Sequence, residues 1–389
     1  MTDSDRPSQE IKSVRVILAV TSHLTANGLL IPQLEALTGL GWDVGIICSP
    51  GPLDVGVING SSFIDLVPMS RSINPLADLA ALRSLRKVLK QRKPDVVVAS
   101  TPKAGLLVMI TSFGCRVPIR VLQLRGARWD GLKGLKGLLL RRADWIAIRC
   151  ATDVISVSPS LSTLFVEHKV SKSLPRVLGP GGSKGVDRDV FQPATDYSYD
   201  SEQPRLGFAG RLSVDKGLLT LLSTFRVIKK SIPQATLEII GDLDTSDPIS
   251  RDLHQALSTE AGLSLRGSIH RAELAETMRE WDLLLFPSVR EGLPNVVIEA
   301  AASGIPTIAW DVTGVKDAVR NGDSGMLVAL ANDSDYSNSV LLALQDEMHK
   351  KLREGALVLA ERFDSQEIQL RFSTFLQALI TNRSQKQDN

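Results

Sequence analysis

The chain has 389 residues, more than one hydrophobic core usually organises, so two domains are expected. Hydrophobic residues make up 43% of the sequence and charged residues 23%, as in an ordinary globular protein, and no uncharged apolar run is long enough to span a bilayer. Residues 1–15 are polar and carry Asp3, Asp5 and Glu10 before any apolar stretch, unlike a signal peptide. The three widely spaced cysteines lack a metal-ligand pattern, which indicates reduced thiols in a cytosol.

The first half of the chain alternates predicted strands with predicted helices. Short apolar runs indicate buried strands, and longer stretches with apolar residues three or four apart indicate helices. We expect strands at residues 14–21, 44–48, 96–100, 119–124 and 154–157, and helices at 29–40, 76–91 and 132–150. This half therefore predicts one doubly wound sheet.

Two cations of this half stand where a predicted strand ends. Lys103 lies at a strand-to-helix junction, and Arg125 follows the strand that ends at Leu124. Loops at the carboxyl ends of parallel strands bind phosphates in open α/β sheets. Both residues are therefore candidates for binding a lipid diphosphate.

Positive charge is concentrated in residues 71–149. This segment holds 17 Lys and Arg against 4 Asp and Glu, a net charge of +13, whereas the whole chain carries +2. The cations gather on two predicted helices: Arg83, Arg86, Lys87, Lys90, Arg92 and Lys93 on the first, and Lys133, Lys136, Arg141, Arg142 and Arg149 around Trp145 on the second. Such faces suit an anionic membrane, although two ordinary solvated faces would give the same pattern. No nucleic-acid-binding motif accompanies them, so no nucleic-acid partner is expected.

The second half repeats the alternation after a segment rich in Gly, Pro and polar residues. Residues 181–204 are expected to form an interdomain linker. Further strands are expected at residues 206–209, 236–240, 283–286 and 307–310, with helices between them and a terminal helix at 365–381. Neither half carries a G-x-G-x-x-G fingerprint after its first strand, which argues against a dinucleotide oxidoreductase.

One motif of the second half is the sequence GFAGRLSVDKG, residues 207–217. An apolar strand runs into a glycine turn at Gly210, and a helix is expected to begin near Gly217. Arg211 and Lys216 then flank a strand-to-helix loop, where two cations can neutralise a leaving diphosphate. Taken alone, an Arg and a Lys in a loop are more often solvated surface charges.

The other motif, REGLPNVVIEA at residues 290–300, carries two carboxylates separated by seven residues. Pro294 suits the first helical position, and Gly304 with Pro306 is expected to end that helix about three turns later. Glu291 then precedes the helix and Glu299 lies inside it, beside the unbonded N–H groups of the helix start. Carboxylates for sugar and ribose hydroxyls, with N–H groups for phosphate oxygens, predict a sugar-nucleotide site. The alternative is two solvated surface glutamates.

The loop that contains Asp242, Asp244 and Asp247 is the only acidic group that resembles a metal site in the sequence. A solvated turn explains it better. No metal or other cofactor is therefore expected.

The two motifs, their order and the lead-in Phe286-Pro287-Ser288 resemble the donor half of the family-4 retaining glycosyltransferases, which have the GT-B fold. Segments of the first half are similar to the bacterial capsule, O-antigen and N-glycan enzymes that extend undecaprenyl-diphosphate-linked sugars: residues 100–105, 124–126, 157–160 and 185–187. The similarity covers roughly residues 14–380. It implies two Rossmann-like, doubly wound parallel-sheet domains that face a central cleft.

The resemblance also implies a domain plan. Residues 1–180 would bind the acceptor, residues 181–204 would link the domains, and residues 205–364 would bind the nucleotide sugar. Residues 365–389 would form a helix that crosses back to the N-terminal domain.

By the same resemblance, the donor residues have distinct roles. Arg211 and Lys216 would stabilise the departing diphosphate, Glu291 would hold hydroxyls of the donor sugar, and Glu299 would bind the ribose. The donor-binding residues implied by the two motifs are Gly210, Arg211, Lys216, Glu291, Gly292, Leu293, Pro294, Asn295 and Glu299.

On the acceptor side, the resemblance points to the loops of Lys103 and Arg125 and to the loop at residues 22–28. Many relatives carry paired glycines in this last loop, whereas this chain has Gly28 alone. His23 in this loop is either a surface residue or a catalytic base. Asp317 stands where relatives usually carry glutamate.

Three functions remain open on the sequence. The leading one is a retaining hexosyltransferase that moves a sugar, expected to be a UDP-linked N-acetylhexosamine or related sugar, onto a polyprenyl-diphosphate-linked saccharide. Such an enzyme is expected in the cytoplasm, peripheral on the inner face of the cell membrane through the basic segment. The others are an enzyme of the same fold that uses GDP-mannose or a soluble acceptor, and a non-catalytic sugar-nucleotide-binding scaffold.

Overall fold

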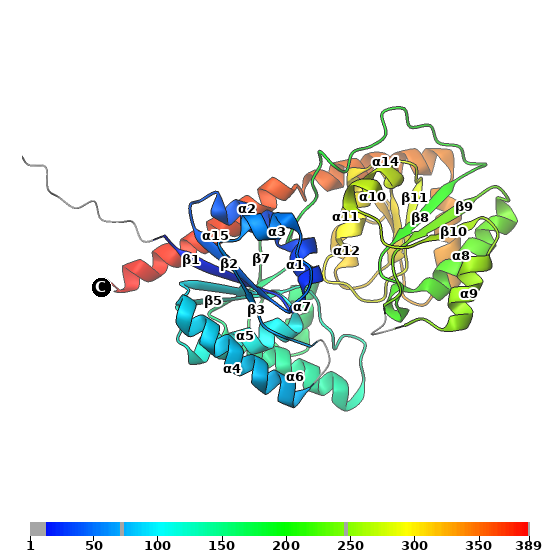
Figure 1. Ribbon diagram of the computed structural model, residues 1–389. Coiled ribbons are helices and arrows are strands. Elements are labelled where there is room, and N and C mark those ends of the chain that lie inside the picture. Colours follow the sequence, from blue (N-terminus) through cyan, green and yellow to red (C-terminus); the bar gives the residue numbers. More distant parts are fainter. Residues whose placement is uncertain (1–12, 71–73, 245–247, 388–389) are drawn as a thin grey trace, which may run out of the picture. The chain divides into compact units, whose positions relative to one another are not determined.

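The computed structural model describes residues 13–70, 74–244 and 248–387. It contains two β-sheets, each alternating along the chain with helices (Figure 1). Every strand of the first sheet precedes residue 178, and every strand of the second follows residue 204. The prediction of two doubly wound α/β domains is therefore confirmed. Residues 1–12, Arg71 and Asp247, which enter the sequence predictions, lie outside the described residues.

The first sheet has seven strands in the order β3-β2-β1-β4-β5-β6-β7. Its strands are β1 (Arg15–Ala19), β2 (Asp43–Cys48), β3 (Phe63–Leu66), β4 (Val96–Ala99), β5 (Ile119–Leu124), β6 (Asp153–Ser156) and β7 (Arg176–Val177). The accompanying helices are α1 (His23–Leu29), α2 (Ile31–Thr38), α3 (Val55–Gly60), α4 (Pro75–Arg92), α5 (Pro102–Gly114), α6 (Gly134–Cys150) and α7 (Pro159–Glu167). Strands β1 and β4 pair in parallel where the strand order reverses, so the loops that follow them meet at a topological switch point.

The second sheet has six strands in the order β10-β9-β8-β11-β12-β13, and all neighbours pair in parallel. Its strands are β8 (Arg205–Ala209), β9 (Thr236–Ile240), β10 (Leu263–Arg266), β11 (Leu283–Phe286), β12 (Thr307–Trp310) and β13 (Gly325–Val328). The helices are α8 (Leu218–Ser231), α9 (Arg251–Thr259), α10 (Arg271–Met278), α11 (Asn295–Ala302), α12 (Val315–Ala318), α13 (Asp333–Ala343), α14 (Asp346–Glu361) and α15 (Ser365–Gln387). Its switch point lies between β8 and β11, the two strands that lead into the two sequence motifs.

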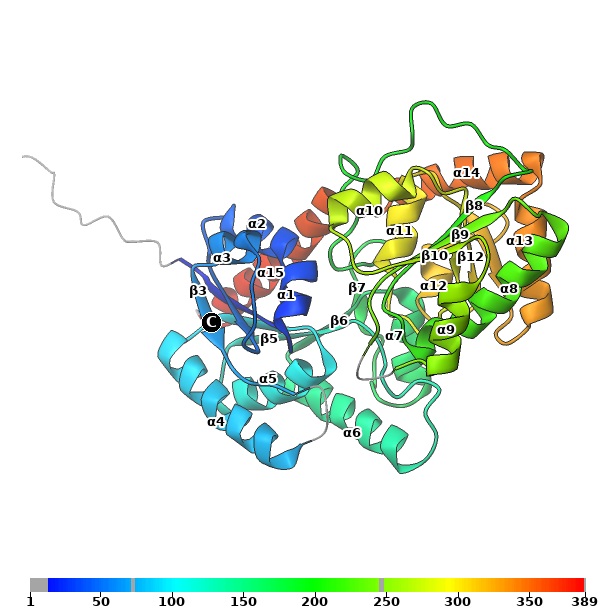
Figure 2. The ribbon, with the colours of Figure 1, turned by 45° about the vertical axis from the view of Figure 1, so that its right-hand side comes forward.

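The core of the second sheet lies on both of its faces. Successive side chains of a strand point to opposite faces, so in β11 Leu283 and Leu285 join one apolar cluster and Leu284 and Phe286 join the other. Helices α8 and α13 cover the first cluster, and α11 and α14 cover the second (Figures 1 and 2). Burial on both faces explains why these strands read as continuous apolar runs.

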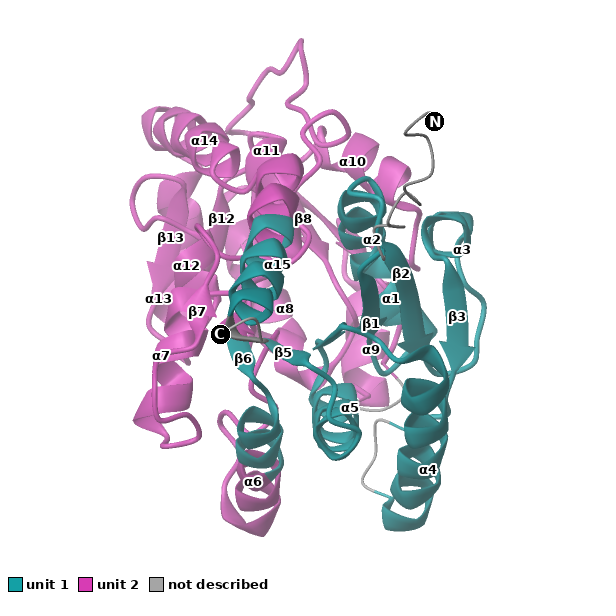
Figure 3. Cartoon of the chain, turned by 90° about the vertical axis from the view of Figure 1, so that its left-hand side faces the viewer, with its two compact units in different colours: residues 1–123, 143–154, 373–389 teal, residues 124–142, 155–372 magenta. Residues whose placement is uncertain are grey.

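Grouping by contacts divides the chain into two compact units (Figure 3). Unit 1 comprises residues 1–123, 143–154 and 373–389, and unit 2 comprises residues 124–142 and 155–372. Helix α15 changes unit at residue 373, and the segment after Leu124 groups with the second sheet. The boundaries and roles of the predicted acceptor and donor domains stay predictions.

Several element boundaries differ from the sequence predictions. The terminal helix extends to Gln387 rather than to residue 381, and the short strands β3, β7, β10 and β13 were not predicted. Helix α1 replaces the polar loop expected at residues 22–28, because the Ser22 side chain caps the helix by accepting from the Thr25 N–H. None of the helices in the described part of the chain combines the length and apolar character that crossing a bilayer requires.

Candidate donor site at the second switch point

Lys216 and Glu291 meet at the switch point of the second sheet. The loop after β8 contains a 3₁₀ turn, η1 (Val214–Lys216), and Gly217 adopts a left-handed conformation, φ +69°, before α8 begins. The ammonium group of Lys216 contacts Oε1 of Glu291, and the Ser288 hydroxyl donates to the same oxygen at 2.7 Å. The side chains of Lys216 and Glu291 are 12% and 15% exposed, so this ion pair is largely shielded from water. The structure thus joins the two motifs.

The η1 turn is tied to the loop after β11 by further bonds. The backbone oxygen of Asp215 accepts from the Val289 N–H at 2.9 Å, and Arg290 Nη2 lies 3.6 Å from the Asp215 carboxylate. Burial alone would raise the pKa of Asp215, but the hydrogen bond from Ser213 and the charges of Lys216, Arg290 and Arg211 together lower it. Asp215 is therefore an ionised group that orients the cationic loop.

Arg211 lies beside this pair but contacts another carboxylate. Its guanidinium binds Asp244, and 54% of its side chain is exposed. Only 7% of the Asp244 side chain is exposed, so the pair joins an exposed guanidinium to a buried carboxylate. Neighbouring Asp242 accepts from the Ser268 N–H at 2.9 Å. Among the described residues, His, Cys and acidic side chains do not form a group of three that could hold a metal ion.

Helix α11 starts one residue later and ends earlier than predicted. Pro294 is the N-cap with ψ 108°, and the helix spans Asn295–Ala302, about two turns instead of three. The helix stops at Ala302 because Ser303 caps it and Gly304 turns the chain with φ +75°. The predicted placement of Glu291 before the helix and Glu299 inside it is confirmed.

Gly292 packs against the backbone that follows β5. A Cβ atom at Gly292 would lie 2.0 Å from the Arg125 carbonyl oxygen, so only glycine fits there. The Ser158 hydroxyl donates to the Gly292 oxygen at 2.6 Å. Gly314, with φ +79°, has room only for hydrogen, because a Cβ atom there would lie 2.3 Å from the same oxygen. These contacts fix the loop that carries Glu291.

Glu299 is buried and contacts two cations. Only 6% of the residue is exposed, and its Oε1 lies 3.1 Å from Lys184 Nζ and 3.3 Å from Arg271 Nη2. Lys184 belongs to the predicted linker and Arg271 begins α10. The alternative of a solvated glutamate on the helix surface is therefore wrong for Glu299.

Asp317 contacts a serine at the start of α7. Its Oδ2 accepts from the Ser160 N–H at 3.0 Å and also from the Ser160 hydroxyl, which lies 2.7 Å from the Gly314 N–H. The Ser160 hydroxyl thus bridges Asp317 and the Gly314 backbone. In this structure the shorter acidic side chain has a structural partner in α7.

Of the predicted acceptor residues, His23, Gly28 and Lys103 belong to unit 1. His23 begins α1 and its ring lies over Gly51, where a Cβ atom would be 1.9 Å from His23 Nδ1. Gly28 is an exposed residue within α1, so the prediction that it lies in a loop is wrong. Lys103 does lie at the strand-to-helix junction, but its Nζ donates to Asp78 Oδ2 at 2.6 Å. The acceptor roles of these residues stay predictions.

Arg125 belongs to unit 2, with the donor motifs. Its Nε and Nη1 atoms are buried although the residue as a whole is partly exposed. Burial lowers the pKa of the Arg125 guanidinium to about 9, so the group stays charged at neutral pH.

The two basic helices differ in their exposed residues. Arg83, Arg86, Lys87 and Lys90 are exposed on α4, whereas Arg92 binds Asp65 at 2.9 Å and Lys93 follows the helix as its C-cap. Helix α6 adds exposed leucines near its basic start: Leu135, Leu138 and Leu139, at 71%, 51% and 51% exposure. Membrane binding by either helix stays a prediction.

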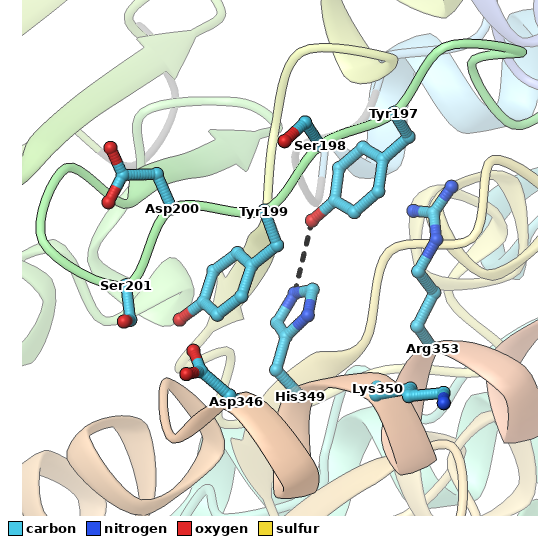
Figure 4. A pocket seen from close by; sticks show the side chains of 9 residues that line it. All are labelled: Tyr197, Ser198, Tyr199, Asp200, Ser201, Asp346, His349, Lys350 and Arg353. Carbon is cyan, nitrogen blue, oxygen red and sulfur yellow. Dashed lines mark hydrogen bonds between the residues drawn. The ribbon is translucent and has the colours of Figure 1, made fainter.

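A separate pocket of about 610 Å³ lies between the linker and α14 and contains none of the predicted site residues (Figure 4). The Tyr199 ring stacks on His349 with centroids 3.8 Å apart, and the Arg353 guanidinium lies 3.6 Å from the Tyr197 centroid. His349 Nε2 lies 3.0 Å from the Asp282 backbone oxygen and must carry a proton, since a carbonyl only accepts. Burial lowers the pKa of His349, so its ring is neutral at pH 7.

Four residues of the candidate donor site were not predicted as parts of it from the sequence: Lys184, Arg271, Asp244 and Ser160. Lys184 lies in the predicted linker and Arg271 at a helix start, and neither falls within a recognisable motif. The one available signal was the lysine in the glycine-rich segment GGSKG. The structure buries this lysine, which is unusual for a residue of a polar linker.

The chain is similar to known glycosyltransferases in both halves. A family model described as "Glycosyl transferase 4-like domain" matches residues 32–181, and one described as "Glycosyl transferases group 1" matches residues 203–346. The capsular polysaccharide biosynthesis glycosyltransferase CapM of Staphylococcus aureus is 30% identical over 371 residues, which cover 91% of this chain and 97% of CapM.

Two further comparisons cover most of the chain. The UDP-Gal:alpha-D-GlcNAc-diphosphoundecaprenol alpha-1,3-galactosyltransferase of Escherichia coli is 25% identical, over 82% of this chain and 84% of that enzyme. The crystal structure of HepE from Anabaena in complex with UDP-glucose has a TM-score of 0.77 and 20% identity, and covers 94% of this chain and 99% of HepE. The two parallel sheets and this likeness confirm the predicted GT-B fold.

The match to CapM extends over nearly the full length of both proteins, and each half matches a glycosyltransferase model. The chain therefore belongs to the GT-B glycosyltransferases.

Proposed function

We propose that this protein is a family-4 retaining hexosyltransferase that moves a sugar from a UDP-sugar donor to a polyprenyl-diphosphate-linked saccharide. The observation that carries the proposal is the contact between Lys216 and Glu291 at the second switch point. It brings a cation suited to a diphosphate beside a carboxylate suited to sugar hydroxyls. In open α/β sheets, ligands bind where the strand order reverses.

The chemistry follows from the charges of this site. The bond between the sugar C1 and the diphosphate oxygen breaks, and negative charge builds up on the departing diphosphate. Lys216, the start of α11 and the exposed guanidinium of Arg211 stabilise that charge. The acceptor hydroxyl attacks C1 on the face that the diphosphate leaves, and its proton passes to a diphosphate oxygen. Glu291 binds donor-sugar hydroxyls and is not the nucleophile.

A glycosidase reading of the two glutamates is less well supported. Glycosidases pair one protonated carboxylic acid with one carboxylate across the scissile bond. Here Glu291 contacts Lys216, and Glu299 contacts Lys184 and Arg271. A carboxylate held by cations suits a hydrogen-bond acceptor for hydroxyl groups better than a general acid.

The acceptor proposal rests on chemistry and on the relatives. The E. coli relative is named for transfer to a diphosphoundecaprenol-linked sugar. In this chain Lys103 and Arg125 are the cations proposed to bind an acceptor diphosphate. The exposed cations of α4 and the leucines of α6 support the proposal of an enzyme that works on the inner face of the cell membrane.

A donor panel tests the proposal. UDP-GlcNAc, UDP-GalNAc, UDP-glucose, UDP-galactose and GDP-mannose are each incubated with the protein and a polyprenyl-diphosphate-linked sugar, and the released nucleoside diphosphate is measured, with and without EDTA. We expect release from a UDP-N-acetylhexosamine or a related UDP-sugar, unchanged by EDTA. Release only from GDP-mannose would overturn the donor assignment. Nucleotide binding without turnover of any donor would identify a scaffold instead.

A further inference from the structure

Glu299 of the second motif pairs with Lys184, which lies outside both sequence motifs. Lys184 Nζ lies 3.1 Å from Glu299 Oε1, and the two side chains are 10% and 8% exposed. Removing a lysine and a carboxylate from water is unfavourable, and their attraction offsets that cost only in good geometry. Fold stability alone is thus a weak reason for such a pair.

The backbone of Lys184 is fixed by the first residues of α15. The Lys184 carbonyl accepts from the Ser365 hydroxyl at 2.7 Å and from Gln369 Nε2 at 3.3 Å. Gly185 has φ +69°, and a Cβ atom there would lie 2.7 Å from Ser365 Cα. The lysine therefore approaches Glu299 from a rigid support.

Both cations contact the same oxygen of Glu299. Arg271 Nη2 lies 3.3 Å from Oε1, the atom that Lys184 also contacts. Arg271 is the first residue of α10, and its guanidinium lies 5.0 Å from the Phe191 ring centroid. This contact helps to hold the guanidinium in place. Arg271 Nη2 makes no hydrogen bond to the described residues, and Lys184 is the nearer of the two cations that restrain the carboxylate.

We propose that Lys184 is a positioning residue that holds the Glu299 carboxylate in the orientation that binds the ribose hydroxyls of the donor. The inference rests on the proposed function, in which Glu299 binds the ribose. Lys184 acts on the donor through Glu299 rather than through the diphosphate. Its loss therefore weakens binding only when the ribose has hydroxyl groups to bind.

Calorimetry with two nucleotides tests this directly. UDP and 2′,3′-dideoxy-UDP are titrated into the wild type and into Lys184→Met, which keeps the side-chain length and leaves Arg271 on Glu299. Lys184→Met should bind UDP about tenfold more weakly than the wild type, because a misoriented carboxylate loses part of its hydrogen bonding to the ribose hydroxyls. The two proteins should bind 2′,3′-dideoxy-UDP equally. Lys184→Gln, which also removes the charge, provides the same comparison should the methionine variant fold poorly.

Two controls define the outcome. Arg226→Met removes a cation from an exposed pair with Glu260, and should leave UDP binding unchanged. In a Glu299→Gln background, Lys184→Met should have no additional effect on UDP affinity. Equal weakening for both nucleotides, or no weakening for either, would overturn the role of Lys184. Failure of the wild type itself to bind UDP would instead overturn the proposed donor.

Discussion

The ammonium group of Lys216 contacts the carboxylate of Glu291 although 75 residues separate them in the chain. The contact forms because β8 and β11 are neighbours in the second sheet, so the loops that follow them emerge side by side. Ser288 donates to the same carboxylate oxygen and fixes it further. In the proposed function, a bound donor shares both charged groups of this pre-formed pair, with its diphosphate near Lys216 and its sugar near Glu291.

Lys216→Ala should lower turnover by about 10²-fold or more, because a cation that stabilises charge growing in the transition state has been removed. Arg211→Ala should act in the same direction. Steady-state kinetics with the preferred UDP-sugar checks both variants, and circular dichroism checks that they fold. Lys230→Ala, which removes an exposed lysine from α8, serves as the control with wild-type turnover. Near-normal turnover in both site variants contradicts their assigned role.

We expect the variants Glu291→Gln and Glu299→Gln to differ in their affinity for free UDP. Glu291 is proposed to touch the transferred sugar, so its variant should lose turnover while its affinity for free UDP changes little. Glu299 is proposed to bind the ribose, so its variant should also bind free UDP more weakly. Isothermal titration with UDP separates the two outcomes. The ribose assignment is wrong if both variants bind UDP as tightly as the wild type.

Neutralising the four exposed cations of α4 should weaken membrane binding. In the variant Arg83, Arg86, Lys87 and Lys90 become glutamine, and the expected loss is about 1 kcal/mol per cation on anionic vesicles. Binding of the wild type should fall as salt rises, since exposed charges are screened beyond about 10 Å at 0.1 M. Vesicle sedimentation measures both effects, and the variant should keep activity on a short soluble acceptor.

A matched variant tests whether vesicle binding depends on the α4 surface or only on the net charge of the protein. Lys230, Arg251, Lys350 and Lys351 are exposed cations of unit 2, and their replacement by glutamine removes the same charge. This control should sediment with anionic vesicles like the wild type. If both quadruple variants bind vesicles equally well, α4 is a solvated face and the basic start of α6 is the remaining candidate.

Lowering the pH from about 7.5 to about 6 should destabilise the protein partly through His349. Burial holds the pKa of the folded His349 below its ordinary value, so the unfolded state takes up a proton first. Stability is then complete above the unfolded pKa of about 6.5, falls as the pH drops through it, and levels off below the folded pKa. Thermal unfolding at both pH values measures the loss. His349→Phe, which keeps the ring stack on Tyr199, should show a smaller loss; an identical loss would show that other groups cause it.

The sequence predicted the strands of the second sheet well because they are buried on both faces. Strands β9, β11 and β12 match their predicted bounds. Strands β3 and β7 were missed because their residues are only partly buried or too few to show a pattern. Helix α1 was missed because Gly28 and polar residues obscure its period, and only the Ser22 cap marks its start.

The donor site was predictable in part because its two motifs are local. The motifs around Arg211 and Glu291 are local, so spacing alone indicated a phosphate-binding loop and a carboxylate before a helix. The partners of Glu299 and Asp317 come from distant segments, and no local pattern indicates that Lys184 or Ser160 will meet them. Long-range pairing depends on sheet order and loop packing, which periodicity does not encode.

The most direct test of the central claim is the stereochemistry of transfer. The purified protein is incubated with the UDP-sugar that the donor panel selects and a polyprenyl-diphosphate-linked sugar, and the anomeric configuration of the product is determined by proton NMR. The account predicts a product that keeps the α configuration of the donor. A β-linked product, or cleavage of the donor without any transfer to the lipid-linked sugar, would contradict it.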